Sequence, residues 1–181
     1  MRRWILLVMV SMFGSPASSG TGGTEASEPV NVIIETGRDV GRCDDGASLS
    51  YPPPPYKGSA YFLQRVDPDF AAQHGDLTKQ QAVWLHRLAG PSGANRLFTA
   101  ANGDRAIVFW SCKAGDCGEN IAYGAYGLQP KAYLIELREG TNHRALGTAA
   151  ASLAAAIACA RAQDEVLRRH TAEQLKKQPG R

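Results

Sequence analysis

Two cysteines five positions apart, Cys112 and Cys117, lie between two apolar runs with strand character, 106–110 and 121–126. In an oxidising compartment their thiols can close a small ring at the tip of a hairpin. Such a ring contributes roughly 2 kcal/mol by the chain-entropy argument. Its local effect is more important, because a loop that has already lost freedom loses less entropy on binding. We therefore expect a preorganised, protruding recognition loop.

The first 17 residues have the pattern of a secretory signal peptide. Arg2 and Arg3 supply positive charge, residues 4–13 are apolar, and small residues lead up to Ala17. The apolar stretch is too short to span a bilayer. We expect cleavage near Ala17, a periplasmic location and no membrane attachment after cleavage; the alternative is a retained membrane anchor.

The exported chain would carry almost no net charge. Cleavage removes Arg2 and Arg3, which leaves 18 basic residues against 17 acidic ones and a formal charge of +1. This balance is not that of a nucleic-acid-binding protein. About 160 remaining residues suit one domain with its own core.

Four cysteines in an exported chain favour disulfides over metal ligands, so no metal or cofactor is expected. Besides the short ring, Cys159 can pair with Cys43. That bond would close a long loop and contribute about 5 kcal/mol by the same entropic argument. The other two pairing schemes would sacrifice the short ring.

The pattern after residue 96 predicts an antiparallel meander of four strands. The first two, 97–101 and 105–111, are joined by Asn102-Gly103, which is typical of a type I′ turn. The third is 121–126. In the fourth, 131–138, we expect one face to carry Tyr133, Ile135 and Leu137, and the other Ala132, Leu134, Glu136 and Arg138.

Helical patterns flank the expected meander. Asp67-Pro68-Asp69 predicts a helix start, for a short helix that ends at Gly75. A second helix is expected from Thr78 to Gly90, with Trp84, Leu85 and Leu88 on one face. A late helix is expected from Arg144, because Leu146, Ala150, Leu153, Ile157 and Ala160 recur at spacings of four and three.

These patterns predict an α+β fold: an antiparallel meander with helices packed on one face and a disulfide-closed protruding loop. The expected segments are a signal peptide at 1–17, a flexible or extended region at 18–58, the α+β domain at 59–163 and a polar tail at 164–181. Region 18–58 includes a strand candidate at 30–34. It also includes a proline-rich spacer at 51–56, expected to be extended.

Residues 97–137 resemble the Ivy family, the periplasmic inhibitors of c-type lysozyme. The resemblance rests on an apolar strand that enters Ser111-Cys112-Lys113, on Asp116-Cys117-Gly118, and on a following strand with Ala125-Tyr126-Gly127. It implies that the loop enters the lysozyme cleft, where two carboxyl groups perform catalysis. The implied inhibitory loop consists of Cys112, Lys113, Ala114, Gly115, Asp116 and Cys117.

The loop departs from the family sequence Cys-Lys-Pro-His-Asp-Cys at its centre. Gly115 stands where the family has histidine, and Ala114 stands in place of proline. Lys113 remains as a cation that can approach a carboxylate. Asp116 is expected to cap amides of its own loop. The partner implied is c-type lysozyme or another muramidase, and the resemblance also admits a homodimer.

The sequence leaves two alternatives to inhibition. The first is a non-inhibitory envelope module that binds another protein, in which the ring only braces a hairpin. The second is an enzyme, which the sequence does not favour. The histidines at positions 74, 86, 143 and 170 are scattered, no known catalytic motif is present, and a Cys112 nucleophile would require a reduced thiol.

Overall fold

The structure is a computed structural model that describes residues 41–43 and 46–176. The predicted signal peptide at 1–17 and the strand candidate at 30–34 lie outside the described residues. Among the described helices, none combines the length and apolar character needed to cross a membrane.

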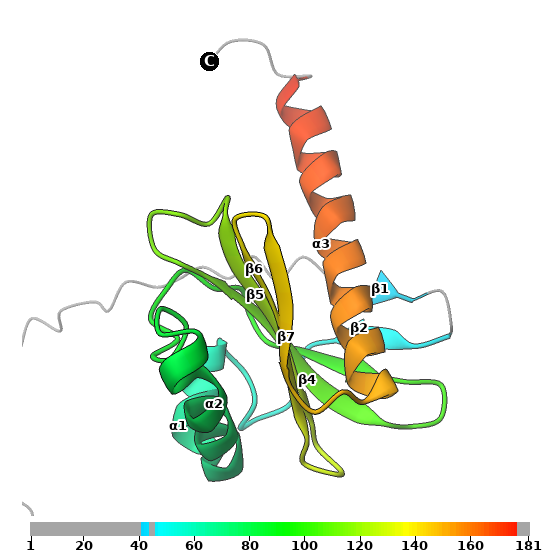
Figure 1. Cartoon of the computed structure of the whole chain (residues 1–181). Coiled ribbons are helices and arrows are strands. Elements are labelled where there is room, and N and C mark those ends of the chain that lie inside the picture. Colours follow the sequence, from blue (N-terminus) through cyan, green and yellow to red (C-terminus); the bar gives the residue numbers. More distant parts are fainter. Residues whose placement is uncertain (1–40, 44–45, 177–181) are drawn as a thin grey trace, which may run out of the picture. The chain divides into compact units, whose positions relative to one another are not determined.

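One antiparallel sheet of seven strands organises the described chain (Figure 1). The strands lie side by side in the order of the sequence, so each pairs with the next along the chain. The meander and the α+β class predicted from the sequence are therefore confirmed. The strands are β1 (Gly41–Arg42), β2 (Ser48–Ser50), β3 (Arg96–Thr99), β4 (Arg105–Cys112), β5 (Asn120–Gly127), β6 (Tyr133–Glu139) and β7 (Asn142–Gly147).

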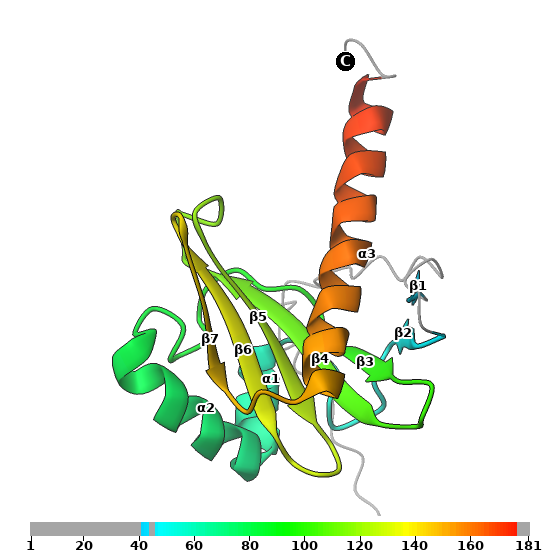
Figure 2. The same cartoon turned by 45° about the vertical axis from the view of Figure 1, so that its right-hand side comes forward.

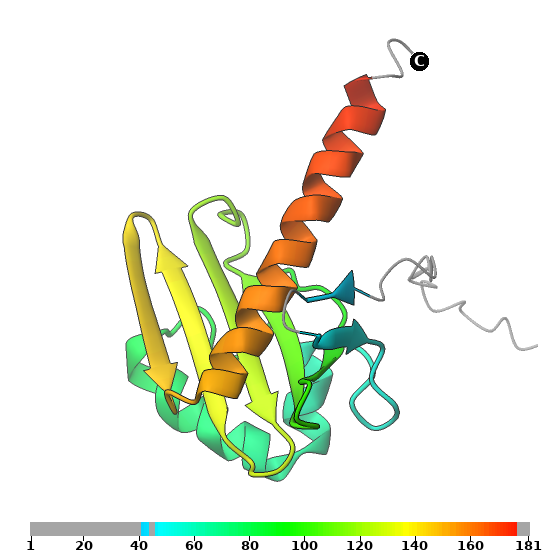
Figure 3. The same ribbon diagram turned by 90° about the vertical axis from the view of Figure 1, so that its right-hand side faces the viewer.

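The helices divide between the two faces of the sheet, whereas the sequence pattern predicted all of them on one face. Helices α1 (Ala60–Val66) and α2 (Pro68–Gln81) cover one face, and α3 (Ala151–Lys176) crosses β4, β5 and β6 on the other (Figures 2 and 3). The central strands are buried on both faces, because their two sets of alternating side chains each meet a helical layer.

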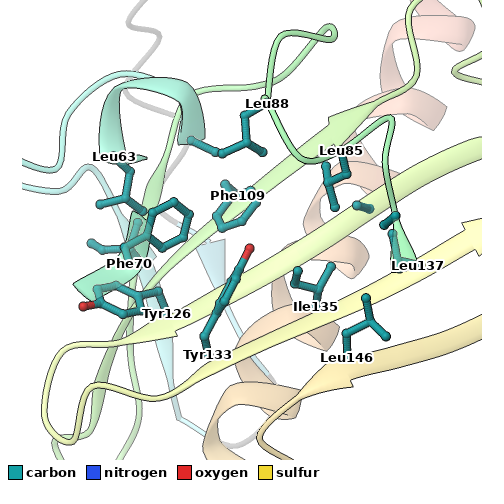
Figure 4. Close-up of a cluster of buried hydrophobic side chains, with 14 of the residues drawn as sticks. Leu63, Phe70, Leu85, Leu88, Phe109, Tyr126, Tyr133, Ile135, Leu137 and Leu146 are labelled. Carbon is teal, nitrogen blue, oxygen red and sulfur yellow. The ribbon is translucent and has the colours of Figure 1, made fainter. Parts of the chain in front are cut away.

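The α1–α2 face contains the aromatic part of the core (Figure 4). Phe70 of α2 packs edge-on against Phe109 and Tyr126, with ring centroids 5.7 and 5.3 Å apart. Tyr133, Ile135 and Leu137 of β6 all point into this cluster, as their spacing predicted. Each is at most 2% exposed.

The α3 face is packed more closely through small residues. Ala156, Ile157 and Ala160 of α3 are fully buried against Val108 and Ala125 of the sheet. Alanine lets a helix backbone approach a sheet closely, so this face needs fewer large side chains. The opposite orientation of Leu134 on β6, which was also predicted, places it in this layer.

The predicted break between two helices at Gly75 is wrong. Helix α2 runs without interruption through Gly75 and Thr78, and residues 83–87 form turns instead of a helix. Thr78 does not cap a new helix, because its hydroxyl donates a hydrogen bond to the carbonyl of His74, one turn earlier. The predicted start is confirmed: the Asp67 carboxylate accepts hydrogen bonds from the amides of Asp69 and Phe70.

The predicted helix start at Arg144 is also wrong, because residues 142–147 form β7. Its register pairs Leu146 with Ile135 of β6, which places Leu146 in the α1–α2 layer. Leu153 of α3 packs in the other layer. The helical spacing therefore connects a strand residue, Leu146, with a helix residue, Leu153. Their side chains pack on opposite faces of the sheet.

Three turn-rich segments differ from expectation. Residues 41–50, which belong to the region expected to be flexible or extended, contribute β1 and β2 to the sheet. The proline run forms a turn closed by the Tyr56 amide and the Pro53 carbonyl, not an extended spacer. The β3–β4 connection spans residues 100–104 and only Gly103 has positive φ, whereas a type I′ turn requires it at both central residues.

Both expected disulfides are present. Cys43, between β1 and β2, pairs with Cys159 of α3 across a sequence separation of 116 residues. Cys112 pairs with Cys117. The Cys43–Cys159 disulfide joins the β1–β2 connection to α3.

Candidate functional site

The Cys112–Cys117 loop extends from the end of the two strands at the centre of the sheet (Figure 2). Cys112 is the last residue of β4 and is fully buried, whereas Cys117 is exposed. The disulfide thus ties an exposed loop to a fixed point in the core. The pairing of β4 with β5 continues in register up to Cys112 and Ile121, so the loop begins where the sheet ends.

Backbone hydrogen bonds give the loop a defined course. The Asp116 amide donates to the Lys113 carbonyl at 2.9 Å, which closes a turn over 113–116. The Asn120 amide donates to the Asp116 carbonyl at 2.9 Å, and the Lys113 amide donates to the Asn120 carbonyl at 3.0 Å. Residues 113–120 therefore form a closed unit with its own hydrogen bonds, as preorganisation requires.

The side chain of Asp116 has a different role from the one predicted. Its carboxylate accepts a hydrogen bond from the side-chain amide of Asn120 instead of from backbone amides of the loop. The carboxylate thereby fixes the base of the loop and is only partly exposed.

The tip of the loop consists of Lys113, Ala114 and Gly115, all exposed. The Lys113 ammonium forms no ion pair with any described residue. Gly115 has a φ of 79°, and a Cβ placed on it would meet no atom within 4 Å. The tip thus presents a free cation beside a position with open space around it.

The segment that supports the loop was not identified from the sequence. The Pro91 carbonyl accepts two hydrogen bonds from the residues that enter the loop. One comes from the Cys112 amide and the other from the Ser111 hydroxyl. A Cβ on Gly90 would lie 2.0 Å from the Cys112 carbonyl oxygen. Gly90-Pro91 was interpreted as the end of a helix, but only glycine permits this close approach.

The neighbouring hairpin supports the other side of the loop. The Arg138 guanidinium of β6 donates to the Gly118 carbonyl, and the Gly140 amide donates to the Glu119 carbonyl at 2.9 Å. The loop is consequently held from two sides while its tip stays free. No sequence signal pointed to Arg138 in this role beyond its place on the predicted strand.

Two of the four histidines, His74 and His86, form hydrogen bonds with residues of α2, of the turn that follows it and of β6. His74 is fully buried between α2 and the sheet, and His86 bonds the Thr78 hydroxyl at 3.1 Å. Within the described residues, no three side chains of the metal-ligating types cluster together.

No known protein family matches the chain, and no curated protein matches it either.

Proposed function

We propose that the protein is an exported inhibitor of lysozyme or of a related muramidase, and that the Cys112–Cys117 loop enters the enzyme's cleft. The observation that supports this most directly is the form of the loop. It is closed by a disulfide, hydrogen-bonded within itself, supported from two sides and exposed at its tip. A loop of this kind loses little conformational entropy when it docks.

The chemistry of the tip suits a cleft that contains carboxyl groups. A retaining glycosidase has two carboxyl groups close together at its catalytic centre. The unpaired ammonium of Lys113 can form a charge-assisted hydrogen bond with one of them. Gly115 adds no side chain, so its contribution is limited to backbone groups and to a narrow tip.

The test is a titration of the oxidised, processed protein against hen lysozyme in a cell-wall lysis assay. Three variants accompany it: Gly115→His, Lys113→Ala, and Lys79→Ala as the control. Lys79 is an exposed lysine on α2, outside the loop and the segments that support it. Histidine is tolerated at positive φ better than most side chains, and the space around position 115 is open, so we expect the Gly115→His variant to fold.

Each outcome separates a different reading. Inhibition that is lost in Lys113→Ala but kept in Lys79→Ala supports insertion of the loop. Inhibition by Gly115→His alone would mean that the scaffold suits this enzyme class but that the natural target differs from hen lysozyme. If neither the unaltered protein nor any variant inhibits hen lysozyme or another muramidase, a non-inhibitory protein-binding module would be favoured.

A further inference from the structure

A groove of about 390 Å³ lies on the α3 face of the sheet, beside the helix. Helix α3 crosses β4, β5 and β6, and residues of β7 on this face stay exposed, among them His143 and Ala145. The floor is formed by two rows of cross-strand neighbours, and the second half of α3 forms one wall. One row consists of Ile121, Arg138 and His143. The other consists of Tyr123, Glu136 and Ala145.

The lining of this groove is basic although the chain as a whole is nearly neutral. Three arginines direct their charge to it, and Glu136 is the single carboxylate among the residues that line it. Glu136 is already paired with Arg161, which also covers the Tyr123 ring at 5.3 Å. The three arginines are Arg138, Arg161 and Arg168. The guanidinium of Arg144, which also borders the groove, lies on the opposite face, where it bonds the Gln81 carbonyl and pairs with Glu139.

Two of these arginines have unused capacity for hydrogen bonds. Arg168 has a side chain that is 64% exposed, and its nearest carboxylate is Glu165 at 3.7 Å. Arg138 donates one Nη2 bond to the loop, but its buried Nε has no partner within the described residues. The groove therefore holds positive charge that its own acidic residues do not neutralise.

The spacing of the charges favours a chain of carboxylates over a single small anion. Arg161 and Arg168 are seven residues apart on α3, which is roughly 10 Å along the helix axis. Arg138 lies across the groove on β6. Cations spread over such a distance do not converge on one phosphate, whereas successive acidic side chains of a polypeptide can meet them in turn.

We propose that this groove binds an acidic segment of the partner protein that the Cys112–Cys117 loop enters. The groove and the loop are continuous: Arg138 bonds the Gly118 carbonyl, and Ile121 pairs with Cys112. The second half of α3 extends past the sheet at the same end as the loop (Figures 2 and 3). That the groove and the loop bind the same partner rests on the proposed function. The target is then a muramidase with carboxylates beside its cleft.

The first test measures binding of a fluorescein-labelled peptide of eight glutamates by fluorescence anisotropy at low ionic strength. Arg168→Glu reverses one charge of the groove. Arg169→Glu is the matched control, because Arg169 is the next residue of α3, is 69% exposed at its side chain and contacts the same Glu165, but does not line the groove. We expect Arg168→Glu to weaken binding about tenfold and Arg169→Glu less than about twofold.

Three results would overturn the groove as a site for an acidic segment. The first is no binding to the unaltered protein, and the second is an equal loss in both variants. The third is displacement of the peptide by millimolar inorganic phosphate at constant ionic strength, which would indicate a small-anion site. Circular dichroism of both variants checks that α3 still forms.

A second measurement separates this inference from the proposed function. Arg168→Glu, Arg169→Glu and Lys113→Ala are each titrated against the muramidase that the unaltered protein inhibits most strongly. Loss in Lys113→Ala and in Arg168→Glu supports one partner for both surfaces. Loss in Lys113→Ala alone leaves the proposed function standing and overturns the shared partner. If no muramidase is inhibited, the proposed function fails, and with it the identification of the partner, whatever the peptide shows.

Discussion

Arg96 on β3 and Asp164 on α3 form a two-pronged ion pair, with Nη1–Oδ1 at 2.9 Å and Nη2–Oδ2 at 3.0 Å. The Tyr123 hydroxyl donates to the same carboxylate at 3.1 Å. Burial and this carboxylate raise the pKa of Tyr123 to about 12, which keeps its hydroxyl protonated as a donor. Together these contacts attach the middle of α3 to the sheet.

Replacing Asp164 by alanine should destabilise the protein by about 2 kcal/mol. The Arg96 side chain is only 12% exposed and would keep its charge without a partner. Urea unfolding at pH 7 with the disulfides intact measures the change. Glu165→Ala is the control, because Glu165 is the next residue and about half exposed, and it should lie within about 0.5 kcal/mol of the unaltered protein. Equal effects in the two variants would contradict the anchoring role of Asp164.

The two disulfides should contribute unequally to the free energy of unfolding. Cys43 and Cys159 are separated by 116 residues, and Cys112 and Cys117 by five. By loop-closure entropy the long link contributes about 5 kcal/mol and the short ring roughly 2. Denaturant unfolding of the double variants Cys43→Ala/Cys159→Ala and Cys112→Ala/Cys117→Ala measures both losses. A greater loss from opening the short ring would show that native-state contacts outweigh chain entropy here.

The stability of the protein should fall as the pH drops from about 6.5 to 4. His74 is fully buried, which lowers its pKa to about 4. Nε2 faces the Leu85 carbonyl at 3.2 Å and must carry the proton, so Nδ1 accepts from the Tyr133 hydroxyl at 3.0 Å. The unfolded state binds a proton near pH 6.5 and the folded state does not, so acidification favours unfolding, by roughly 3 kcal/mol across this range.

Free energies of unfolding measured between pH 4 and 7 test the role of His74. His74→Gln should lower stability at every pH but remove most of this slope, since the titrating group is gone. His143→Gln is the control, because His143 is exposed on β7 and its loss should leave the slope intact. An unchanged slope in His74→Gln would assign the acid sensitivity to other groups.

Gly124 of β5 should not accept even a methyl group. It lies opposite Phe109 of β4, and a Cβ there would come within 2.2 Å of the Phe109 ring. Phe109 is fully buried among aromatic rings and cannot withdraw. Gly124→Ala should therefore cost about 3 kcal/mol. Gly118→Ala is the control, with no atom within 4 Å of its added Cβ. A thermal melt of both variants distinguishes them, and a stable Gly124→Ala would mean that the core relaxes there.

Features that rest on local chemistry were predictable from the residues alone. Alternation in the run 131–138 predicted which side chains of β6 face each layer, because successive residues of a strand point to opposite sides. Asp67-Pro68 predicted the start of α2, since an aspartate cap and a following proline both favour that geometry. The spacing of Cys112 and Cys117 predicted the closed loop, because so short a separation brings two thiols together at almost any turn.

Features that depend on what lies across the sheet became visible only in the folded chain. Leu146 shares a helical spacing with Ala150 and Leu153, but residues 142–147 pair with β6 because the edge of the sheet offers backbone partners that the sequence does not display. The helices occupy both faces because the central strands are apolar on both sides, and each side requires cover. The basic groove follows from the same arrangement. Arg138 and Arg168 are thirty positions apart in sequence, and only the crossing of α3 over β6 places them around one surface.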